Sequence, residues 1–234
     1  MSEQVAGAYD RRAEEYIDLF GSVDATSARD RVVIETWADG VRGPILDAGC
    51  GPGQWTHHVA GRREEPVAGV DCSRRFIASA RRRFPGIDFI EGDLARLPFA
   101  DGAFGGVLAW FSVIHTAPSE VPAILREFAR VTRRDGSLLM GFFSGPDQEP
   151  FDHAVTTAWY WTSDALGRKL ERAGFAVEWA VERHEARMRP QAEIIATRRG
   201  AAQRADSRQG ASGCVRQPGN AYIRDLSAHN PESI

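Results

Sequence analysis

The segment from Ile45 to Gly53 contains the residues with the clearest chemical potential. It reads Ile-Leu-Asp-Ala-Gly-Cys-Gly-Pro-Gly, so an apolar run leads directly into a glycine-rich turn. Glycines let the backbone turn sharply and let a ligand approach the main chain closely. A phosphate-binding fingerprint reads Gly-x-Gly-x-x-Gly, whereas the spacing here is Gly-x-Gly-x-Gly with Asp47 just ahead. An anionic side chain is a poor neighbour for a pyrophosphate and a good one for an ammonium group.

Two further acids follow the next two apolar runs. Asp71 ends the run that begins at Val67, where a carboxylate can accept hydrogen bonds from ribose hydroxyls. Asp93 follows the third run, where a carboxylate can accept from an exocyclic amine of adenine while Leu94 packs on the ring. Acids after three successive strands would line the carboxyl edge of a sheet, which is where open α/β sheets bind ligands.

Short β-rich runs alternate with helical patterns from Pro44 to about Arg199, and this alternation predicts a parallel sheet covered by helices. The predicted strands are Ile45–Ala48, Val67–Asp71, Ile87–Glu91, Gly106–Phe111, Ser137–Phe143, Ala176–Arg183 and Ala192–Arg198. Between them we predict a helix capped by Ser73, one capped by Ser119 and one from Ser163 to Gly174. Asp135-Gly136 predicts a turn into the next strand.

The two ends of the chain fall outside this alternation. Residues 1–43 predict a helical lid with one helix around Tyr9 to Phe20 and one around Ser27 to Ala38, lying across the ligand edge of the sheet. Residues 44–199 form the predicted core domain. Residues 200–234 are rich in Ala, Arg, Gln, Ser and Gly, and we predict a disordered tail there.

The combination of motifs resembles the class I S-adenosylmethionine-dependent methyltransferases, and more narrowly their small-molecule branch with a domain of the methyltransferase 11 or 25 type. The resemblance covers roughly Tyr9 to Arg199. It is carried by Asp47-Ala48-Gly49-Cys50-Gly51-Pro52-Gly53, Val70-Asp71, Gly92-Asp93-Leu94, Leu97-Pro98-Phe99 and Arg130-Val131 with Gly136. It implies an α/β, Rossmann-like sheet of seven mostly parallel strands with helices on both faces, the last strand being antiparallel. Gly105 departs from the family, which often has Asp there.

The resemblance also implies S-adenosylmethionine as the cofactor. We expect Asp47, Gly49 and Gly51 to hold its methionine end, Asp71 its ribose, and Asp93 and Leu94 its adenine. Trp110 would flank the sulfonium as a cation–π partner, although a core role is open. The full set of expected cofactor contacts is Tyr16, Asp47, Gly49, Cys50, Gly51, Gly53, Asp71, Cys72, Asp93, Leu94 and Trp110. Of these, the two cysteines are expected to fill space beside the cofactor and not to act as nucleophiles.

Methyl transfer from a sulfonium is an in-line displacement, in which alignment in a dry pocket matters most and a general base is optional. His115 is the candidate base, with a packing role as the alternative. Aromatic residues of the N-terminal helix and of the long connection after Phe143 are expected to enclose a fairly apolar small-molecule acceptor. The sequence has no Asn/Asp-Pro-Pro-Tyr/Phe motif after the fourth strand and no paired carboxylates suited to Mg²⁺, which counts against nucleobase methylation and metal dependence.

Composition narrows the classes of protein further. The 234 residues are 43% hydrophobic and 26% charged with a net charge of −3, which indicates an ordinary globular protein with no bulk attraction to nucleic acid. No apolar run or leader predicts a membrane or secreted protein, and three cysteines without repeated spacing suit the reducing cytoplasm. We expect a monomer or homodimer. The open alternatives are an NAD(P)-binding oxidoreductase or epimerase, a non-catalytic nucleoside-binding module and an RNA methyltransferase.

Overall fold

The computed structural model describes residues 3–185 and 188–200, so the predicted tail beyond residue 200 lies outside the described residues. Seven strands of this described part form the central sheet. They are β1 (Ile45–Ala48), β2 (Val67–Asp71), β3 (Asp88–Glu91), β4 (Phe104–Trp110), β5 (Thr132–Phe143), β8 (Phe175–Arg183) and β9 (Gln191–Arg198). Two short strands, β6 (Pro150–Phe151) and β7 (Ala158–Trp159), pair separately in the long connection after β5.

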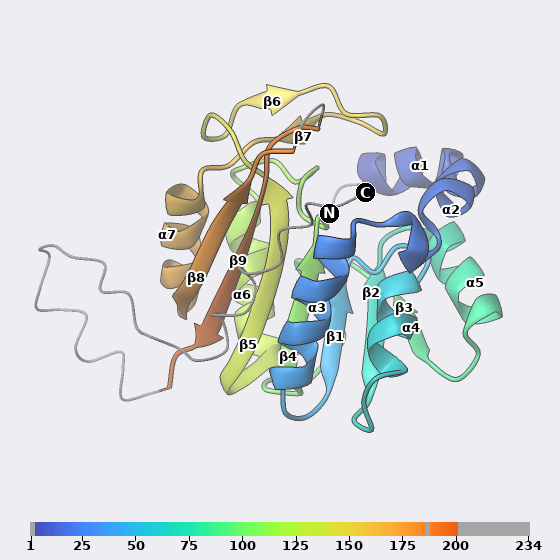
Figure 1. The fold of residues 1–234 in the computed structure, drawn as a ribbon, viewed down its shortest axis with the longest axis horizontal. Helices are drawn as coiled ribbons and strands as arrows, with labels where there is room; N and C mark the ends of the chain where they lie inside the picture. The colour runs from blue at the N-terminus through green and yellow to red at the C-terminus, as the bar shows by residue number, and fades with distance from the viewer. Residues whose placement is uncertain (1–2, 186–187, 201–234) are drawn as a thin grey trace, which may run out of the picture. The chain divides into compact units, whose positions relative to one another are not determined.

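The helices in chain order are α1 (Glu3–Arg11), α2 (Ala13–Phe20), the 3₁₀ helix η1 (Val23–Ala25), α3 (Ala28–Gly40), α4 (Gln54–Ala60), α5 (Arg74–Arg83), α6 (Val121–Val131) and α7 (Ser163–Ala173). The strand order is β3-β2-β1-β4-β5-β9-β8 (Figure 1). The strands from β1 to β5 pair in parallel, and β9 runs antiparallel between β5 and β8. The predicted Rossmann-like fold class is therefore confirmed, including the antiparallel last strand.

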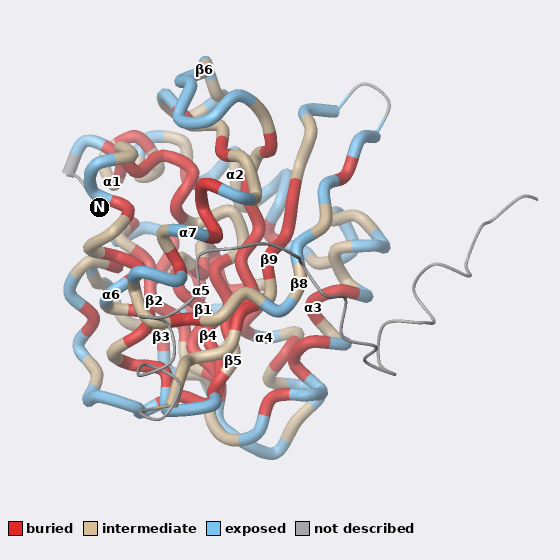
Figure 2. The backbone as a smooth tube through the Cα atoms, turned by 90° about the vertical axis from the view of Figure 1, so that its left-hand side faces the viewer, coloured by how far each residue is buried: buried red, intermediate tan, exposed pale blue. Residues whose placement is uncertain are grey.

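The alternation of side chains along the strands assigns the helices to two layers. On β1, Ile45 belongs to a cluster with α3 and α4, while Leu46 belongs to a larger cluster with α6 and α7. Successive strand residues point to opposite faces, so each buried strand packs against helices on both sides. Buried backbone accordingly runs through the middle of the molecule (Figure 2). Asp47 shares the α3 and α4 face with Ile45, because it follows two residues later on the same strand.

The predicted helix starts are partly wrong in detail. Ser73 caps α5 as predicted, with its hydroxyl accepting from the Phe76 amide. Ser119 does not cap α6, which follows Glu120 and has no side-chain cap. α7 begins at Ser163 and ends before Gly174 as predicted, with the Thr162 hydroxyl accepting from the Ala165 amide. The error at α6 arises where a capping residue and a proline lie close together, so sequence alone does not decide between neighbouring positions.

The N-terminal region contains one more helix boundary than predicted. The expected helix around Tyr9 to Phe20 is divided at Arg12, and α1 extends back to Glu3. No glycine or proline marks this bend. The Arg12 guanidinium instead donates to the Ala154 carbonyl, a tertiary contact with the long connection that local sequence cannot reveal.

Gly105 has a steric explanation at this position. A Cβ on Gly105 would lie 1.8 Å from the carbonyl oxygen of Arg42, so the aspartate common in the family would not fit here. The neighbouring pairing of β4 with β5 is irregular, because Phe104 pairs with Thr132 whereas Gly106 pairs with Ser137. The predicted turn at Asp135 is part of this irregularity, and Asp135 has a φ of +60°.

A buried ion network ties α3 to the last two strands. The Arg183 guanidinium lies 2.6 Å from Asp30 of α3 and 2.8 Å from Glu193 of β9. Arg29 adds a second contact to Glu193 at 3.3 Å. The side chains of Arg183 and Glu193 are 3% and 0% exposed, so each charge depends on the other for compensation. The network fixes the start of α3 against the sheet.

We expect Arg183→Met to destabilise the protein by about 3–5 kcal/mol, because the negative charges of Asp30 and Glu193 would lose the guanidinium that compensates them. Urea unfolding followed by circular dichroism measures the loss. Arg74→Gln is the matched control, because Arg74 is 80% exposed in its ion pair with Glu91. That pair should contribute less than about 1 kcal/mol. Equal losses in the two variants would show that the network does not anchor α3.

Candidate cofactor and acceptor site

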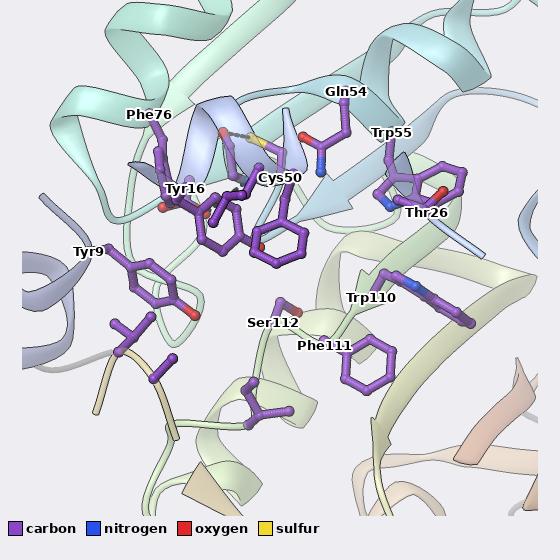
Figure 3. A pocket seen from close by; sticks show the side chains of 18 of the residues that line it. Tyr9, Tyr16, Thr26, Cys50, Gln54, Trp55, Phe76, Trp110, Phe111 and Ser112 are labelled. Atoms are coloured by element: carbon purple, nitrogen blue, oxygen red, sulfur yellow. Dashed lines mark hydrogen bonds between the residues drawn. The ribbon is translucent and has the colours of Figure 1, made fainter. Parts of the chain in front are cut away.

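A cavity of about 580 Å³ opens at the carboxyl ends of β1, β2 and β4. Most of the predicted cofactor residues line it: Tyr16, Asp47, Gly49, Cys50, Gly51, Asp71, Cys72 and Trp110. In Figure 3, Tyr9, Tyr16 and Phe76 gather on one side, and Trp110 and Phe111 lie on the other. The cavity thus joins the glycine-rich turn to the aromatic residues of the N-terminal helices and of β4.

The three glycines of the turn have positive φ angles and serve different purposes. A Cβ on Gly49 would lie 2.2 Å from Ser112, and one on Gly53 would lie 2.7 Å from Phe89, so both positions require close packing within the protein. Gly51 has a φ of +54° and no atom within 4 Å of its Cβ position, although it lines the cavity. The open space beside Gly51 is therefore available to a ligand.

Asp47 is buried at the end of β1 and accepts a hydrogen bond of 2.7 Å from the Thr56 hydroxyl. Burial, helped by the nearby charge of Asp71, raises the pKa of Asp47 to about 7 against the opposing effect of that hydrogen bond. An ionised carboxylate here lacks a cationic partner among the groups that shift its pKa. A positively charged ligand group would supply one.

Asp71 organises the glycine turn from the end of β2. One carboxylate oxygen accepts from the Gly51 amide at 2.9 Å, and the other accepts from the Ser73 amide at 2.7 Å. Burial raises the pKa of Asp71 despite these two bonds. The Cys72 side chain also hydrogen-bonds Asp71. A carboxylate has about four lone-pair sites, so these three hydrogen bonds still leave capacity for a ligand hydroxyl. Asp71 both shapes the turn and faces the cavity.

Three of the predicted cofactor residues are not in the cavity wall. Gly53 precedes α4 and packs against Phe89. Asp93 is exposed, and its carboxylate accepts from the Ala95 amide at 3.0 Å. The Leu94 side chain is fully buried in the cluster with α6 and α7, on the other side of the sheet from Asp47. The side chain of Leu94 is therefore placed for core packing, and the adenine contacts of Asp93 and Leu94 stay predictions.

The cavity wall contains two buried polar atoms without hydrogen-bond partners in the described structure. They are Oε1 of Gln54, which follows the glycine turn, and Oγ of Ser112, which follows β4. A buried polar atom without a partner is destabilising, and a bound ligand commonly satisfies it. These atoms, the open space at Gly51 and the two acids together fit the ribose and the free amino-acid group of a nucleoside that carries an amino acid. The sequence motifs single out neither residue, although each directly follows a predicted motif.

Burial keeps both cavity cysteines as thiols. The pKa of Cys72 is raised to about 12, and that of Cys50 is also raised, with desolvation as the main cause in each case. A thiolate is the nucleophilic form of cysteine. These side chains therefore occupy space in the wall, and their protonation state does not suit a nucleophile.

His115 does not line the cavity itself, but its ring packs against those of Tyr9 and His153, which do. Its Nδ1 is 2.9 Å from the Thr157 carbonyl oxygen, which can only accept, so Nδ1 carries the proton and Nε2 of the neutral ring has a lone pair. Nε2 is buried and without a partner in the described residues. Burial lowers the pKa of His115, which keeps the ring neutral at neutral pH.

His153 is not singled out by the sequence, yet it lines the cavity. Its ring centre is 4.9 Å from that of His115, and burial with the neighbouring His115 lowers its pKa to about 4. The residue comes from the long connection after β5, where no local pattern distinguishes it. The same connection supplies the Thr157 carbonyl that orients His115.

The structure also bears on metals and membranes. In residues 3–185 and 188–200, no group of three His, Cys, Asp or Glu side chains is arranged to hold a metal ion. None of the helices in this part of the chain has the length and apolar character needed to cross a bilayer.

Comparisons with known proteins identify the domain. The family described as "Methyltransferase domain" matches residues 45–136. Demethylmenaquinone methyltransferase of Beutenbergia cavernae is 34% identical over 152 residues, which cover 63% of this chain and 61% of that protein. The O-methyltransferase cnsE of Penicillium expansum is 30% identical over 172 residues, covering 66% and 59%. The chain therefore spans about three fifths of the length of these relatives.

Solved structures share the fold at low sequence identity. The (4+2)-cyclase SpnF matches with a TM-score of 0.72 and 19% identity, covering 85% of this chain and 96% of that one. The 1,6-didemethyltoxoflavin-N1-methyltransferase of Burkholderia thailandensis, solved with bound 1,6-didemethyltoxoflavin and S-adenosylhomocysteine, matches with a TM-score of 0.69 and 19% identity, covering 84% and 88%. Residues 45–136 of this chain therefore form a methyltransferase domain, and the chain has the fold of these solved structures.

Proposed function

We propose that this protein transfers a methyl group from S-adenosylmethionine to an oxygen or nitrogen atom of a small-molecule acceptor without a metal ion. The observation that carries the proposal is the cavity in which Asp47, Asp71 and the open position at Gly51 lie together. When bound, S-adenosylmethionine supplies a methyl group activated by the sulfonium. The remaining work of the protein is to bind, align and exclude water.

The polar end of the cavity suits the methionine and ribose groups of the cofactor. Asp47 would accept from the α-ammonium, and its buried charge would gain a cationic partner. Asp71 would accept from the ribose hydroxyls with its remaining lone pairs. Gln54 and Ser112 would complete the polar contacts, because each has a buried oxygen without a partner in the described residues. Tyr16 of α2 would cover the cofactor.

The aromatic end of the cavity suits the acceptor. Trp110 would flank the sulfonium as a cation–π partner. Phe111 and Phe143 have ring centres 5.2 Å apart and both line the cavity, so a flat apolar acceptor would pack against this pair of rings. The helices α1 and α2 would act as a lid over both ligands.

His115 is the proposed base. Its neutral ring has a lone pair on Nε2, which can take a proton from an acceptor hydroxyl or amine. His153 would contact the acceptor directly, because it lines the cavity beside His115. The carbonyl of Thr157 holds the tautomer that this role requires.

The direct test is product formation. Purified protein incubated with S-adenosylmethionine and a panel of phenols, enols and amines should release S-adenosylhomocysteine and yield a methylated acceptor, both detected by mass spectrometry. His115→Gln should lower kcat at least about a hundredfold, the lower end of the usual range for a general base, and leave the Kd for S-adenosylhomocysteine unchanged. His184→Gln is the matched control, because His184 is 70% exposed. Full activity of the His115→Gln variant would remove His115 from the chemistry.

Asp71→Asn should weaken S-adenosylhomocysteine binding by about 10–100-fold, since hydrogen bonds to a charged group each contribute about 1.5–3 kcal/mol. Calorimetric titration measures the Kd. Asp88→Asn is the control, because Asp88 is exposed on the neighbouring strand β3. Circular dichroism of the unliganded variant checks that the domain is folded. Unchanged affinity in the folded Asp71→Asn variant would refute the ribose role.

Asp47→Asn should weaken S-adenosylhomocysteine binding and yet stabilise the protein without ligand. The raised pKa of about 7 means that ionised Asp47 destabilises the fold. The free energy of unfolding should therefore fall as the pH rises from about 4, the pKa of aspartate in the unfolded chain, to about 7. Asparagine removes that charge, so the unfolding midpoint should rise by about 2–4 °C for each kcal/mol relieved. Scanning calorimetry at pH 8 measures it.

The same carboxylate should make cofactor affinity depend on pH. Below about pH 7 a bound ligand must displace the Asp47 proton, so the Kd of the wild-type protein should rise up to about tenfold per pH unit. Asp47→Asn should lose this dependence. A pH dependence that is identical in the wild type and the variant would show that Asp47 does not face the ammonium group.

A further inference from the structure

Large exposed apolar side chains collect at the mouth of the cavity. In the described part of the chain, four such residues are exposed: Leu19 by 56%, Phe20 by 47%, Val32 by 43% and Met188 by 51%. Leu19, Phe20 and Met188 also line the cavity, whereas Val32 lines a separate surface groove. We call Leu19, Phe20 and Met188 the rim residues.

Single apolar residues are common on protein surfaces and need no explanation. The rim residues differ because two elements far apart in the sequence bring them to one opening. Leu19 and Phe20 end α2, and Met188 lies in the connection between β8 and β9. Exposed apolar side chains gathered around a cavity mark a surface that a ligand or partner covers.

The apolar rim continues into the aromatic interior. The ring of Phe20 is 5.1 Å from that of Tyr16, which in turn is 5.1 Å from that of Phe76. Phe111 lies across the cavity from Tyr16 and Phe76 (Figure 3), and its ring contacts that of Phe143. A ligand that reached from Phe111 to the mouth would therefore have apolar side chains on both sides of the cavity.

The charged residues of the lining are already engaged. Arg12 and Glu15 of the N-terminal region pair with each other at 2.7 Å, and Asp30 pairs with Arg183 at 2.6 Å. The acids at the strand ends, Asp47 and Asp71, lie where the proposed cofactor binds. Recognition at the mouth is therefore governed by apolar contact and not by an available charge.

These observations point to the acceptor class, and the inference rests on the proposed function. We propose that the acceptor is an amphiphile whose flat reactive head group enters the aromatic part of the cavity, while an aliphatic chain leaves between the end of α2 and Met188. The chain would cover the rim residues and withdraw them from water. The reacting atom would remain deep in the cavity, where water is excluded.

The test uses a homologous series of probes on the full chain saturated with S-adenosylhomocysteine. Phenol, 4-butylphenol and 4-hexylphenol present the same head group with growing chains, and calorimetric titration gives each Kd. A fully buried methylene contributes about 0.8 kcal/mol, or about fourfold in Kd, and half burial at the rim about twofold. The hexyl compound should therefore bind at least about 50-fold more tightly than phenol.

Three rim variants and one control test where the aliphatic chain of the ligand lies. Leu19→Ser, Phe20→Ser and Met188→Ser should each weaken 4-hexylphenol binding about threefold or more and change phenol binding less than about twofold. Val32→Ser should alter neither, because Val32 is similarly exposed but faces the separate groove. An equal effect of Val32→Ser, or no dependence on chain length, would overturn the proposal.

Two further measurements separate the other occupants and the other proposal. The protein is sedimented with phosphatidylcholine vesicles, and its self-association is measured in the ultracentrifuge. If the rim variants abolish vesicle binding or self-association, and the phenols show no effect of chain length, the rim belongs to a lipid surface or a second copy. Either result would overturn the acceptor proposal. S-adenosylhomocysteine titrated alone tests the cofactor. If it binds and the phenol series shows no trend, only the amphiphile inference fails. If it does not bind, the proposed function itself fails.

Discussion

The burial of two carboxylates at the ends of adjacent strands is the constraint on which the site depends. Asp47 lies on β1 and Asp71 on β2, and desolvation together with the charge of Asp71 raises the pKa of Asp47. The protein compensates only in part, through the Thr56 hydroxyl and the amides of Gly51 and Ser73. A cationic ligand would relieve the remaining electrostatic strain. On the proposed function, the charge that destabilises the unliganded fold would therefore also provide selectivity for the cofactor.

Local sequence pattern predicts some parts of this fold and not others. The bounds of β1 and β2 are as predicted, because both are short apolar runs that contain or end at a functional acid. The bend at Arg12 and the cavity position of His153 are not predictable, because both depend on contacts between segments that lie far apart in the sequence. Leu94 shows a different limit. The motif predicts that Leu94 follows β3, but it does not predict that the side chain packs on the face of the sheet covered by α6 and α7.

Fold and chemistry are separate questions for this architecture. The same fold supports a methyltransferase solved with S-adenosylhomocysteine and also the cyclase SpnF, at equal sequence identity to this chain. Shared topology positions a ligand site at the strand ends, and the residues above that edge decide the reaction. In this chain we propose that those residues are Trp110 and Phe111 at the end of β4, the two histidines and the apolar rim. Most of them come from connections and helices that the sheet itself does not specify.

The most direct test of the account is a calorimetric titration of the wild-type chain with S-adenosylhomocysteine, with NADH titrated in parallel. Buried carboxylates beside a glycine turn should favour the nucleoside with an ammonium group over the one with a pyrophosphate. We predict saturable one-to-one binding of S-adenosylhomocysteine and no detectable binding of NADH. Binding of NADH in its place would mean that the turn accepts a pyrophosphate, which would contradict the assigned role of Asp47 and favour an oxidoreductase.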